Sequence, residues 1–325
     1  MTRVHVVGAS GYAASEVIRI LRKHPNVRLG ALESATHAGE RIGAHAPSLR
    51  ALDRTYDAPG TTLAVLAEGD VALHAGRAHE AAALVPALLA RGARVIDFSD
   101  RFRSTAVSGE AVYGFPERYA DAIARARLVA NPGCYPTATL LALWPLEVFA
   151  AGIEQIVVDA KSGISGAGRA PLAGSLFAEV AGDVRAYGLA GHRHAPEIVA
   201  ELAALGIEAP LTFTPHVVPL SRGMLVDAYA ICSYELADDA LAAAYRRCYA
   251  SNPFVRLLPP NQAPNLPGLV GTNDAEIHLS RSGRVVRVLC AIDNLGRGAA
   301  GQAVANLNLM LGLPTGTALD DRIVA

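Results

Sequence analysis

The chain has 325 residues, 51% of them apolar and 18% charged, which is enough for two domains with separate cores. Its formal net charge of −1 gives no basic field that would indicate nucleic-acid binding. The start, "MTRVHVVGAS", lacks the regions of a signal peptide, no run approaches about 18 uninterrupted apolar residues, and the four cysteines form no CxxC pair. The sequence therefore predicts a cytoplasmic protein with reduced thiols, no membrane span and no metal site.

The first 140 residues alternate β-branched runs with runs rich in alanine and leucine. Strands are predicted at 4–9, 27–34, 70–75 and 93–99, and helices at 15–24 and 80–92. This alternation indicates an α/β fold, a Rossmann-type doubly wound parallel sheet with crossover helices.

The pattern changes in the second half, where strands become longer and helices fewer. Strands are predicted at 153–160, 211–218, 224–233, 274–280 and 284–292, separated by irregular connections such as the proline-rich 257–269. They predict an α+β domain with a mixed or antiparallel sheet. The final apolar helix, 298–313, is expected to pack back near the first domain.

A glycine pattern lies in the first strand–helix turn. Gly8, Gly11 and Ala14 have G-x-x-G-x-x-A spacing directly after the first strand. Glycine permits a tight turn and a close approach to a pyrophosphate, which the helix N-terminus favours. We therefore predict a dinucleotide-binding domain over 1–140, completed by a C-terminal helix at about 296–325, and a catalytic and oligomerisation domain over 141–295.

The end of the second predicted strand leaves the choice of nicotinamide cofactor open. Glu33 favours NAD, because an acidic residue there binds a free ribose 2′-hydroxyl. Ser34, with His37 and Arg41 nearby, favours NADP, whose 2′-phosphate needs hydroxyls and cations.

Cys134 differs from the other three cysteines. Cys232 and Cys290 lie in predicted strand interiors and Cys248 in a helical stretch, where free cysteines act as small apolar side chains. Cys134 instead follows a Pro-Gly turn and opens a helix, where the thiolate is favoured and nearby N–H groups could hold an oxyanion. The sequence predicts a catalytic nucleophile.

Such a thiol needs an acid/base partner. His192 and His194 lie in "GLAGHRHAPEI", and one of them is predicted to transfer the proton. The segment 161–169, "KSGISGAGR", combines glycines and hydroxyls with Lys161 and Arg169, which suits a phosphate or carboxylate. His216, Arg103 and Arg222 are further candidates, each of which could equally be structural.

Together these features indicate one reaction class, a reductase that works through a thioester. The thiolate attacks an acyl phosphate, phosphate leaves, hydride reduces the thioester, and the thiohemiacetal collapses to an aldehyde.

The chain resembles the N-acetyl-γ-glutamyl-phosphate reductase family of arginine biosynthesis over nearly its whole length. The matching stretches occur in the family's order: "GASGY", "VIDFS", "AVYGFPE", "LVANPGCYPTA", "KSGISGAGR", "GHRHAPEI", "FTPHVVPLSRGM" and "IDNLGRGAAGQAVANLNLM".

The resemblance implies an NADPH-linked reductase of a small acyl phosphate, assembled as a homotetramer or homodimer. It implies the catalytic residues Cys134, His192 and His194. The cofactor-binding residues that it implies are Gly8, Ser10, Gly11, Tyr12, Ala13, Ser34, Ser162, Gly163 and Asn294. The substrate-binding residues that it implies are Arg103, Asn131, Lys161, Ser165, Arg169, His216 and Arg222.

The sequence departs from the family pattern at four places. Ala13-Ala14 replaces a loop glycine, "ESAT" replaces the S-R expected at the 2′-phosphate, "GRAHEA" (76–81) replaces a Pro-His, and residues 99–103 read "SDRFR" before a shortened stretch. A sister reductase of carrier-bound aminoadipyl phosphate, which shares these motifs, remains an alternative. A nucleotide-sensing protein without catalysis is a second alternative, which the intact Cys134 opposes.

Overall fold

The computed structural model describes residues 1–103, 111–169, 174 and 176–319. The chain divides into two units: unit 1 contains Met1–Pro132 and the segment from Ala299 onward, and unit 2 contains Gly133–Gly298. The predicted boundary between residues 140 and 141 falls inside helix α6 (Cys134–Leu143), whereas the units divide before this helix. The helix therefore belongs as a whole to unit 2.

Unit 1 contains a six-stranded sheet in the order β2-β1-β3-β4-β6-β5, with every pair parallel. Its strands are β1 (Thr2–Val7), β2 (Val27–Glu33), β3 (Val71–His74), β4 (Arg94–Asp97), β5 (Ala111–Tyr113) and β6 (Leu128–Ala130). The predicted parallel α/β fold is confirmed. The chain adds β2 on one side of β1 and β3 on the other, so the strand order reverses there, which is where such sheets bind ligands.

Unit 1 also contains helices, and all of them except the C-terminal one lie between strands of its sheet in the sequence. They are α1 (Tyr12–Leu21), α2 (Ile42–His45), α3 (Thr61–Val65), α4 (Ala78–Ala90), α5 (Pro116–Arg125) and α10 (Gly301–Met310). The C-terminal α10 packs against α5 and α1. Gln302 and Asn306 on α10 both donate side-chain N–H groups to the carbonyl of Gly114, at 3.0 Å each. These buried bonds attach the end of the chain to the N-terminal sheet.

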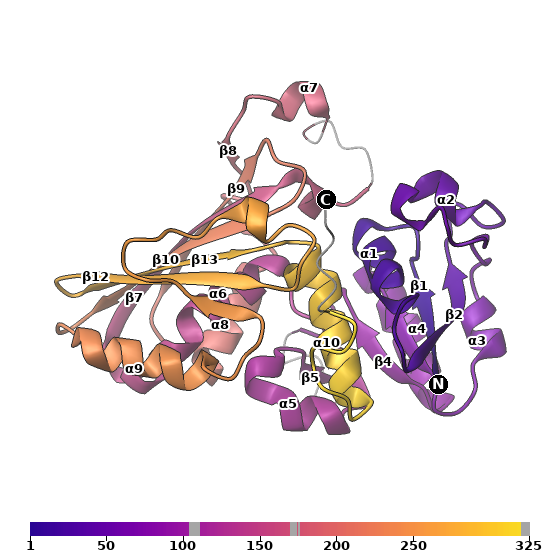
Figure 1. Cartoon of the computed structure of the whole chain (residues 1–325), viewed down its shortest axis with the longest axis horizontal. Coiled ribbons are helices and arrows are strands. Elements are labelled where there is room, and N and C mark those ends of the chain that lie inside the picture. The colour runs from indigo at the N-terminus through magenta and orange to yellow at the C-terminus, as the bar shows by residue number, and fades with distance from the viewer. Residues whose placement is uncertain (104–110, 170–173, 175, 320–325) are drawn as a thin grey trace. The chain divides into compact units, whose positions relative to one another are not determined.

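Unit 2 is built on a mixed seven-stranded sheet in the order β11-β12-β13-β10-β7-β9-β8. Its strands are β7 (Ile153–Gly163), β8 (Arg185–Ala186), β9 (Leu211–Val218), β10 (Met224–Cys232), β11 (Val255–Leu257), β12 (Ala275–Ser282) and β13 (Val285–Ile292). The long strands and the helices α6, α8 (Ala195–Ala204) and α9 (Asp238–Tyr249) are seen together in Figure 1. The predicted mixed sheet is confirmed.

The strands of unit 2 alternate buried and half-buried residues. In β10, Met224, Val226, Ala228, Ala230 and Cys232 are buried, and the residues between them are half-buried. Because side chains alternate between the two faces of a sheet, one face forms the core beneath α6.

The helical run Cys134–Gly152 is long and apolar enough to cross a membrane, judged by length and composition alone. In unit 2, however, 61% of this run is buried inside the protein, and α6 packs on β10 and β13. Its apolar surface is therefore that of a core helix. A helix buried inside a folded domain passes the same composition test as a membrane span.

Candidate active site

The glycine turn lies at the carboxyl end of β1, in unit 1. Gly8 has a φ of +78°, and a Cβ there would lie 2.8 Å from the carbonyl oxygen of Ala75, so no other residue fits without strain. Gly11 is the N-cap of α1 and has no side-chain cap. Ser10, Tyr12 and Ala13 complete the turn, and Ala14 is buried. The start of α1 thus has backbone N–H groups that no side chain caps, as an anion site requires.

The two candidates at the end of β2 have different surroundings. The Glu33 carboxylate is 5% exposed and accepts hydrogen bonds from the N–H groups of Gly60, at 3.2 Å, and Thr62, at the start of α3. The hydroxyl of Ser34 instead donates to that of Ser10, at 2.9 Å, in the glycine turn. Glu33 therefore caps the start of α3, and Ser34 is hydrogen-bonded to the glycine turn.

Cys134 is the first residue of α6, and its side chain is half-buried. The N-cap is Gly133, whose N–H donates to the Glu197 carboxylate of α8 at 2.9 Å. A Cβ at Gly298 would lie 2.8 Å from the Cβ of Cys134, so the backbone of residue 298 packs directly against the cysteine. The helix N-terminus stabilises a thiolate at this position, and the turn that carries it is fixed from two sides.

The other cysteines have surroundings that suppress ionisation. Burial raises the pKa of Cys290 to about 12. Burial also raises the pKa values of Cys232 and Cys248 above their ordinary value. These three thiols are therefore protonated at neutral pH, as their positions in the sequence indicate.

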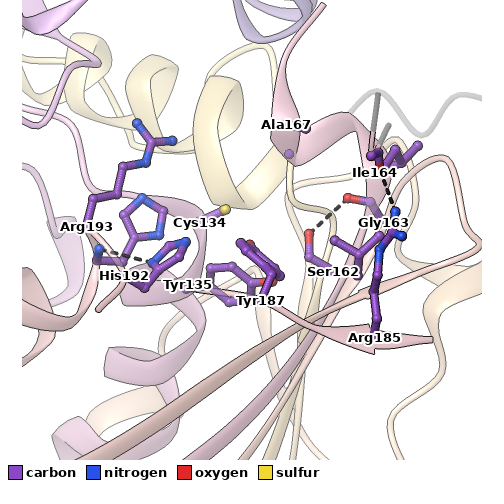
Figure 2. A pocket seen from close by; sticks show the side chains of 14 residues that line it. Cys134, Tyr135, Ser162, Gly163, Ile164, Ala167, Arg185, Tyr187, His192 and Arg193 are labelled. Carbon is purple, nitrogen blue, oxygen red and sulfur yellow. Dashed lines mark hydrogen bonds between the residues drawn. The ribbon is translucent and has the colours of Figure 1, made fainter. Parts of the chain in front are cut away.

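Cys134 opens into a pocket of about 470 Å³ in unit 2. Figure 2 shows its sulfur between the imidazole of His192 on one side and the segment from Ser162 onward on the other. The pocket is lined by Cys134, Tyr135, Ser162, Gly163, Ile164, Gly166, Ala167, Gly174, Arg185, Tyr187, His192, Arg193, His194 and Val217. Five predicted site residues, Cys134, His192, His194, Ser162 and Gly163, thus meet in one cavity.

The two histidines differ in their surroundings. The Nδ1 atom of His192 accepts the backbone N–H of His194 at 3.1 Å, so the neutral ring carries its proton on Nε2. Burial, and then the charge of Arg193, lower the pKa of His192 below its ordinary value. His194 is 4% exposed and is the N-cap residue of α8. The ring of His192 is therefore neutral and carries its N–H on Nε2, the ring nitrogen that the backbone of His194 does not contact.

Two tyrosines hold the His192 ring in place. The rings of Tyr135 and Tyr187 meet it edge to face, with centroids 5.6 and 5.4 Å away. The hydroxyl of Tyr187 donates to that of Tyr135 at 3.2 Å, and that of Tyr135 donates to the carbonyl of His216 at 3.2 Å. Burial raises the pKa of both tyrosines, so both remain neutral.

Asn294 is hydrogen-bonded to the segment that lines the pocket. Its side-chain N–H donates to the Ser165 hydroxyl at 2.9 Å, and its Oδ1 accepts the N–H of Gly223 at 2.8 Å. A Cβ at Gly163 would lie 2.9 Å from the carbonyl oxygen of Leu220. These contacts fix the glycine-rich segment beside the thiol.

Several predicted anion-binding residues have protein partners. Lys161 pairs with Asp159 at 3.1 Å, and His216 lies 3.0 Å from the same carboxylate. Arg222 pairs with the fully buried Asp293 at 2.6 Å. Each of these three side chains thus lies against a carboxylate of unit 2, and Lys161 and His216 share the carboxylate of Asp159.

The other predicted substrate residues lie in two places. In unit 1, Arg103 donates to the carbonyl oxygens of Asn131 and Phe98, at 2.9 and 2.5 Å. The side chain of Asn131 donates to the carbonyl of Ala299 and accepts from Asn306. Arg169 is half-buried in unit 2, outside the set of residues that lines the pocket.

Five residues of the site were not predicted from the sequence motifs. They are Tyr135, Arg185, Tyr187, Arg193 and Glu197. Glu197 had a signal, because it lies three residues after the helix-capping His194, where an acidic residue suits the first turn. Arg193 lies between the two predicted histidines. Tyr187 and Arg185 come from the loop and strand before them, and only the folded chain brings these two into the pocket.

Comparison with known proteins agrees with this architecture. Residues 3–126 match the family described as "Semialdehyde dehydrogenase, NAD binding domain", and residues 134–294 match "Semialdehyde dehydrogenase, dimerisation domain". N-acetyl-gamma-glutamyl-phosphate reductase from Moorella thermoacetica is 42% identical over 98% of each chain, and that from Halorhodospira halophila is 42% identical over 96% of each. The chain belongs to this reductase family. Membership makes it an NAD(P)-binding oxidoreductase of amino-acid biosynthesis.

Solved structures show the same fold at lower identity. Aspartate semialdehyde dehydrogenase II from Vibrio cholerae, complexed with ASA, aligns with a TM-score of 0.72 at 17% identity, over 96% of this chain and 98% of that one. Aspartate semialdehyde dehydrogenase from Candida albicans, solved with NADP, aligns with a TM-score of 0.75 at 16% identity, over 96% of this chain and 98% of that one. The two-domain fold is thus that of the semialdehyde dehydrogenases.

Proposed function

We propose that this chain is a cytoplasmic enzyme that reduces N-acetyl-γ-glutamyl phosphate to N-acetylglutamate 5-semialdehyde, with NADPH as reductant and phosphate as leaving group. The observation that supports this most directly is the half-buried thiol at the start of α6, which shares a pocket with His192 and His194. Relatives that align over 96–98% of both chains carry this activity in their names.

Cys134 supplies the nucleophile. Its thiolate forms a bond to the acyl carbon, the carbon–oxygen bond to phosphate breaks, and phosphate leaves with the electron pair. The positive end of α6 lowers the free energy of both the thiolate and the negative oxygen that forms beside it. The Glu197–Gly133 hydrogen bond keeps the turn in the position that this attack requires. The carbon–sulfur bond breaks when the aldehyde forms, which returns the thiolate.

His192 holds a proton at the reacting oxygen. Its Nδ1 is engaged by the backbone, so only Nε2–H is available toward the pocket. With its pKa lowered, the ring is neutral near pH 7 and acts as a hydrogen-bond donor to the carbonyl oxygen, which suits a developing negative charge. Between the two histidines that the sequence left open, we assign this contact to His192.

Glutamine tests this assignment, because its side-chain N–H can donate where Nε2–H does. His192→Gln is expected to keep at least about ten times more kcat than His192→Ala, since one oxyanion donor contributes roughly 10²-fold or more. A substitution of His194 by Asn serves as the comparison in steady-state assays. Equal losses in the Gln and Ala variants would contradict the assignment.

Arginine side chains in the pocket suit the substrate's charges. Arg185 and Arg193 both line it. Arg185 also donates to the Gly174 carbonyl at 2.7 Å, which directs its guanidinium. Guanidinium groups bind carboxylate and phosphate through paired N–H donors, so these two residues are proposed to hold the anionic ends of the substrate.

The residues of unit 1 fit a dinucleotide. The tight turn at Gly8, which has a positive φ, and the N-terminus of α1, which has no side-chain cap, suit a pyrophosphate, with Ser10, Gly11, Tyr12 and Ala13 around it. Ser162, Gly163 and Asn294 are proposed contacts from unit 2. When bound, the reduced dinucleotide supplies the hydride that converts the thioester to the aldehyde level.

The hydrogen bonds that the Glu33 carboxylate accepts favour NADP over NAD as the cofactor. An acidic residue selects NAD only if its carboxylate is available to the ribose hydroxyls, and this one caps α3. Ser34, next to the glycine turn, then offers its hydroxyl to a 2′-phosphate. Glu33→Gln should therefore leave the NADP/NAD ratio of kcat/KM within about threefold of the parent, and a large gain for NADP would contradict this reasoning.

The deciding experiment is a steady-state assay in the oxidative direction. N-acetylglutamate semialdehyde and phosphate are supplied with each dinucleotide in turn, and reduced dinucleotide is measured by absorbance. Phosphate-dependent turnover with NADP supports the proposal. A parallel assay with acyl phosphate on a carrier protein tests the sister activity, and turnover only with the carrier-bound form would overturn the proposed substrate.

We further propose a homodimer or homotetramer. The matched family of unit 2 is described as a dimerisation domain. Val157, Leu225 and Ile231 alternate with the core residues of β7 and β10 and are half-buried, which suits a sheet face that meets a second copy. Light scattering coupled to gel filtration measures the assembled mass.

A further inference from the structure

Three metal-binding side chains lie together in unit 1, between β2 and α3. The ring nitrogen Nδ1 of His37 lies 3.4 Å from one carboxylate oxygen of Glu40, and Nε2 of His45 lies 2.5 Å from the other. One donor atom from each of the three residues lies within 4.8 Å of the others. No step of the proposed reaction uses these residues together.

We propose that His37, Glu40 and His45 form a binding site for one divalent transition-metal ion of the zinc class. Two imidazoles and a carboxylate are a donor set that Zn²⁺ binds, with the fourth position left to water. Donor atoms around a tetrahedral Zn²⁺ lie about 3.4 Å apart, given metal–ligand distances of about 2.0–2.1 Å. The His37–Glu40 contact has this spacing. The ring of His45, which lies 2.5 Å from the other oxygen of Glu40, would move away from that oxygen to complete the set.

The backbone around the three residues is fixed before any ion binds. The segment is bonded to residues 54–56 through Gly39 N–H to Tyr56 carbonyl, at 2.9 Å, and Tyr56 N–H to Glu40 carbonyl, at 3.0 Å. The ring of Tyr56, itself buried, lies 6.2 Å from each imidazole. Because the main chain is already in place, binding an ion costs little ordering of the loop.

The two imidazoles are stacked on each other and are partly exposed to solvent. Their centroids are 3.8 Å apart with 29° between the planes, and their side chains are 27% and 25% exposed. The neighbouring cation, Arg41, is paired with Asp53 at 2.6 Å. An ion can therefore reach the donors from solvent.

Sequence spacing gave no sign of this site. The pattern H-x₂-E-x₄-H matches no familiar zinc motif, and His37 was of interest only as a neighbour of Ser34. The turn at Gly39, with φ of +82°, folds the chain so that the three side chains converge.

The test measures binding of Zn²⁺ alone to the full, untagged chain by isothermal titration calorimetry. Every protein carries Cys134→Ser, because a thiolate near two histidines could also bind zinc. The site variants are His37→Ala, Glu40→Gln and His45→Ala. His79→Ala is the matched control, since His79 and Glu80 form an exposed pair at 4.0 Å elsewhere in unit 1. Far-ultraviolet circular dichroism checks that each variant folds.

One ion per chain is expected in the parent and in the His79 variant. Each site variant should bind at least about 100-fold more weakly, since loss of one of three protein ligands removes much of the binding free energy. Zn²⁺ should also raise the unfolding temperature of the parent but not that of His37→Ala. Absence of binding in the parent, or unchanged binding in the double variant His37→Ala/His45→Ala, would overturn the proposal.

Discussion

Two helices open the candidate binding regions, α1 in unit 1 and α6 in unit 2, and they begin in the same way. Their N-cap residues, Gly11 and Gly133, have nearly identical backbone angles, with φ of −68° and −70° and ψ of 160° and 157°. Neither N-cap has a side-chain cap, and neither first turn contains an acidic residue. Neither helix therefore has a side chain of its own first turn that caps its positive end, although in α6 the N-cap residue Gly133 donates its N–H to the Glu197 carboxylate of α8.

The two helices differ in the residue that follows the N-cap. In α1 it is Tyr12, which is exposed, whereas in α6 it is Cys134, which faces a pocket. The turn before α6 is also fixed by Glu197, and the first turn of α6 includes Pro136. One backbone arrangement thus serves two purposes: where it is left open it suits a diphosphate, and where it carries a thiol it favours the thiolate.

Removal of the sulfur from α6 should have the largest effect. Cys134→Ser is expected to lower kcat of phosphate-dependent aldehyde oxidation by about 10³-fold or more, as when nucleophiles of other enzymes are removed. Dinucleotide affinity, measured by fluorescence titration, should not change. Cys248→Ser, in a different helix, is the control. Near-normal turnover of the Cys134 variant would eliminate the thioester route.

Loosening the turn of α6 should have the next largest effect. Glu197→Ala leaves the Gly133 N–H without its carboxylate in a buried site, which costs about 1–3 kcal/mol of stability. A displaced nucleophile should lower kcat by roughly 10²-fold. Glu197→Gln retains an acceptor oxygen and should lose less in both urea unfolding and steady-state assays. Equal losses in the two variants would show that the hydrogen bond does not position the cysteine.

The glycines of the α1 turn provide a matched pair. Gly8→Ala places a Cβ 2.8 Å from the Ala75 carbonyl at a φ of +78°, which costs at least about 1–2 kcal/mol and should weaken dinucleotide binding about tenfold or more. Gly11→Ala, at a φ of −68° with its nearest contact at 3.4 Å, should change stability by less than about 1 kcal/mol. Urea unfolding and ligand titration measure both. A larger loss of stability or of dinucleotide affinity in Gly11→Ala than in Gly8→Ala would contradict this prediction.

A pH dependence of stability is the smallest expected effect. His192 has a folded pKa below its ordinary value of about 6.5, so between the two values the unfolded chain binds more protons. Its contribution to stability is therefore complete above about pH 6.5 and is lost as the pH falls toward the folded pKa. His192→Gln should reduce the loss of stability between pH 7.5 and 5.5, measured by urea unfolding. An unchanged slope would show that the ring titrates normally.

Much of the architecture could be predicted, because periodicity and turn residues carry it. The strand predicted at 211–218 coincides with β9, and the predicted strand at 284–292 nearly coincides with β13. The position of Cys134 was also predicted, since a Pro-Gly turn before an apolar run marks a helix start. These features depend on neighbours in sequence, so one chain suffices to find them.

Contacts between distant residues could not be predicted. Glu33 accepts hydrogen bonds from Gly60 and Thr62 at the start of α3, a short helix that the sequence did not predict. The negative charge of Glu33, read from the sequence, therefore could not show that its carboxylate is engaged by the protein. Lys161 had a usable signal. In β7 its neighbours Ala160 and Ser162 are buried, so strand alternation places Lys161 on the opposite face, beside Asp159.

The backbone of Gly298 lies against Cys134, with no room for a single added carbon. Its hydrogen bond from N–H to the Asp293 carbonyl, at 2.9 Å, holds it there. Residue 298 therefore leaves no space for a side chain against the Cβ of Cys134, and a single methyl group there would press on the cysteine. Covalent probes of the cysteine must therefore approach it from the pocket. Inhibitors of different size should differ in their reactivity with Cys134 according to how well they fit that pocket.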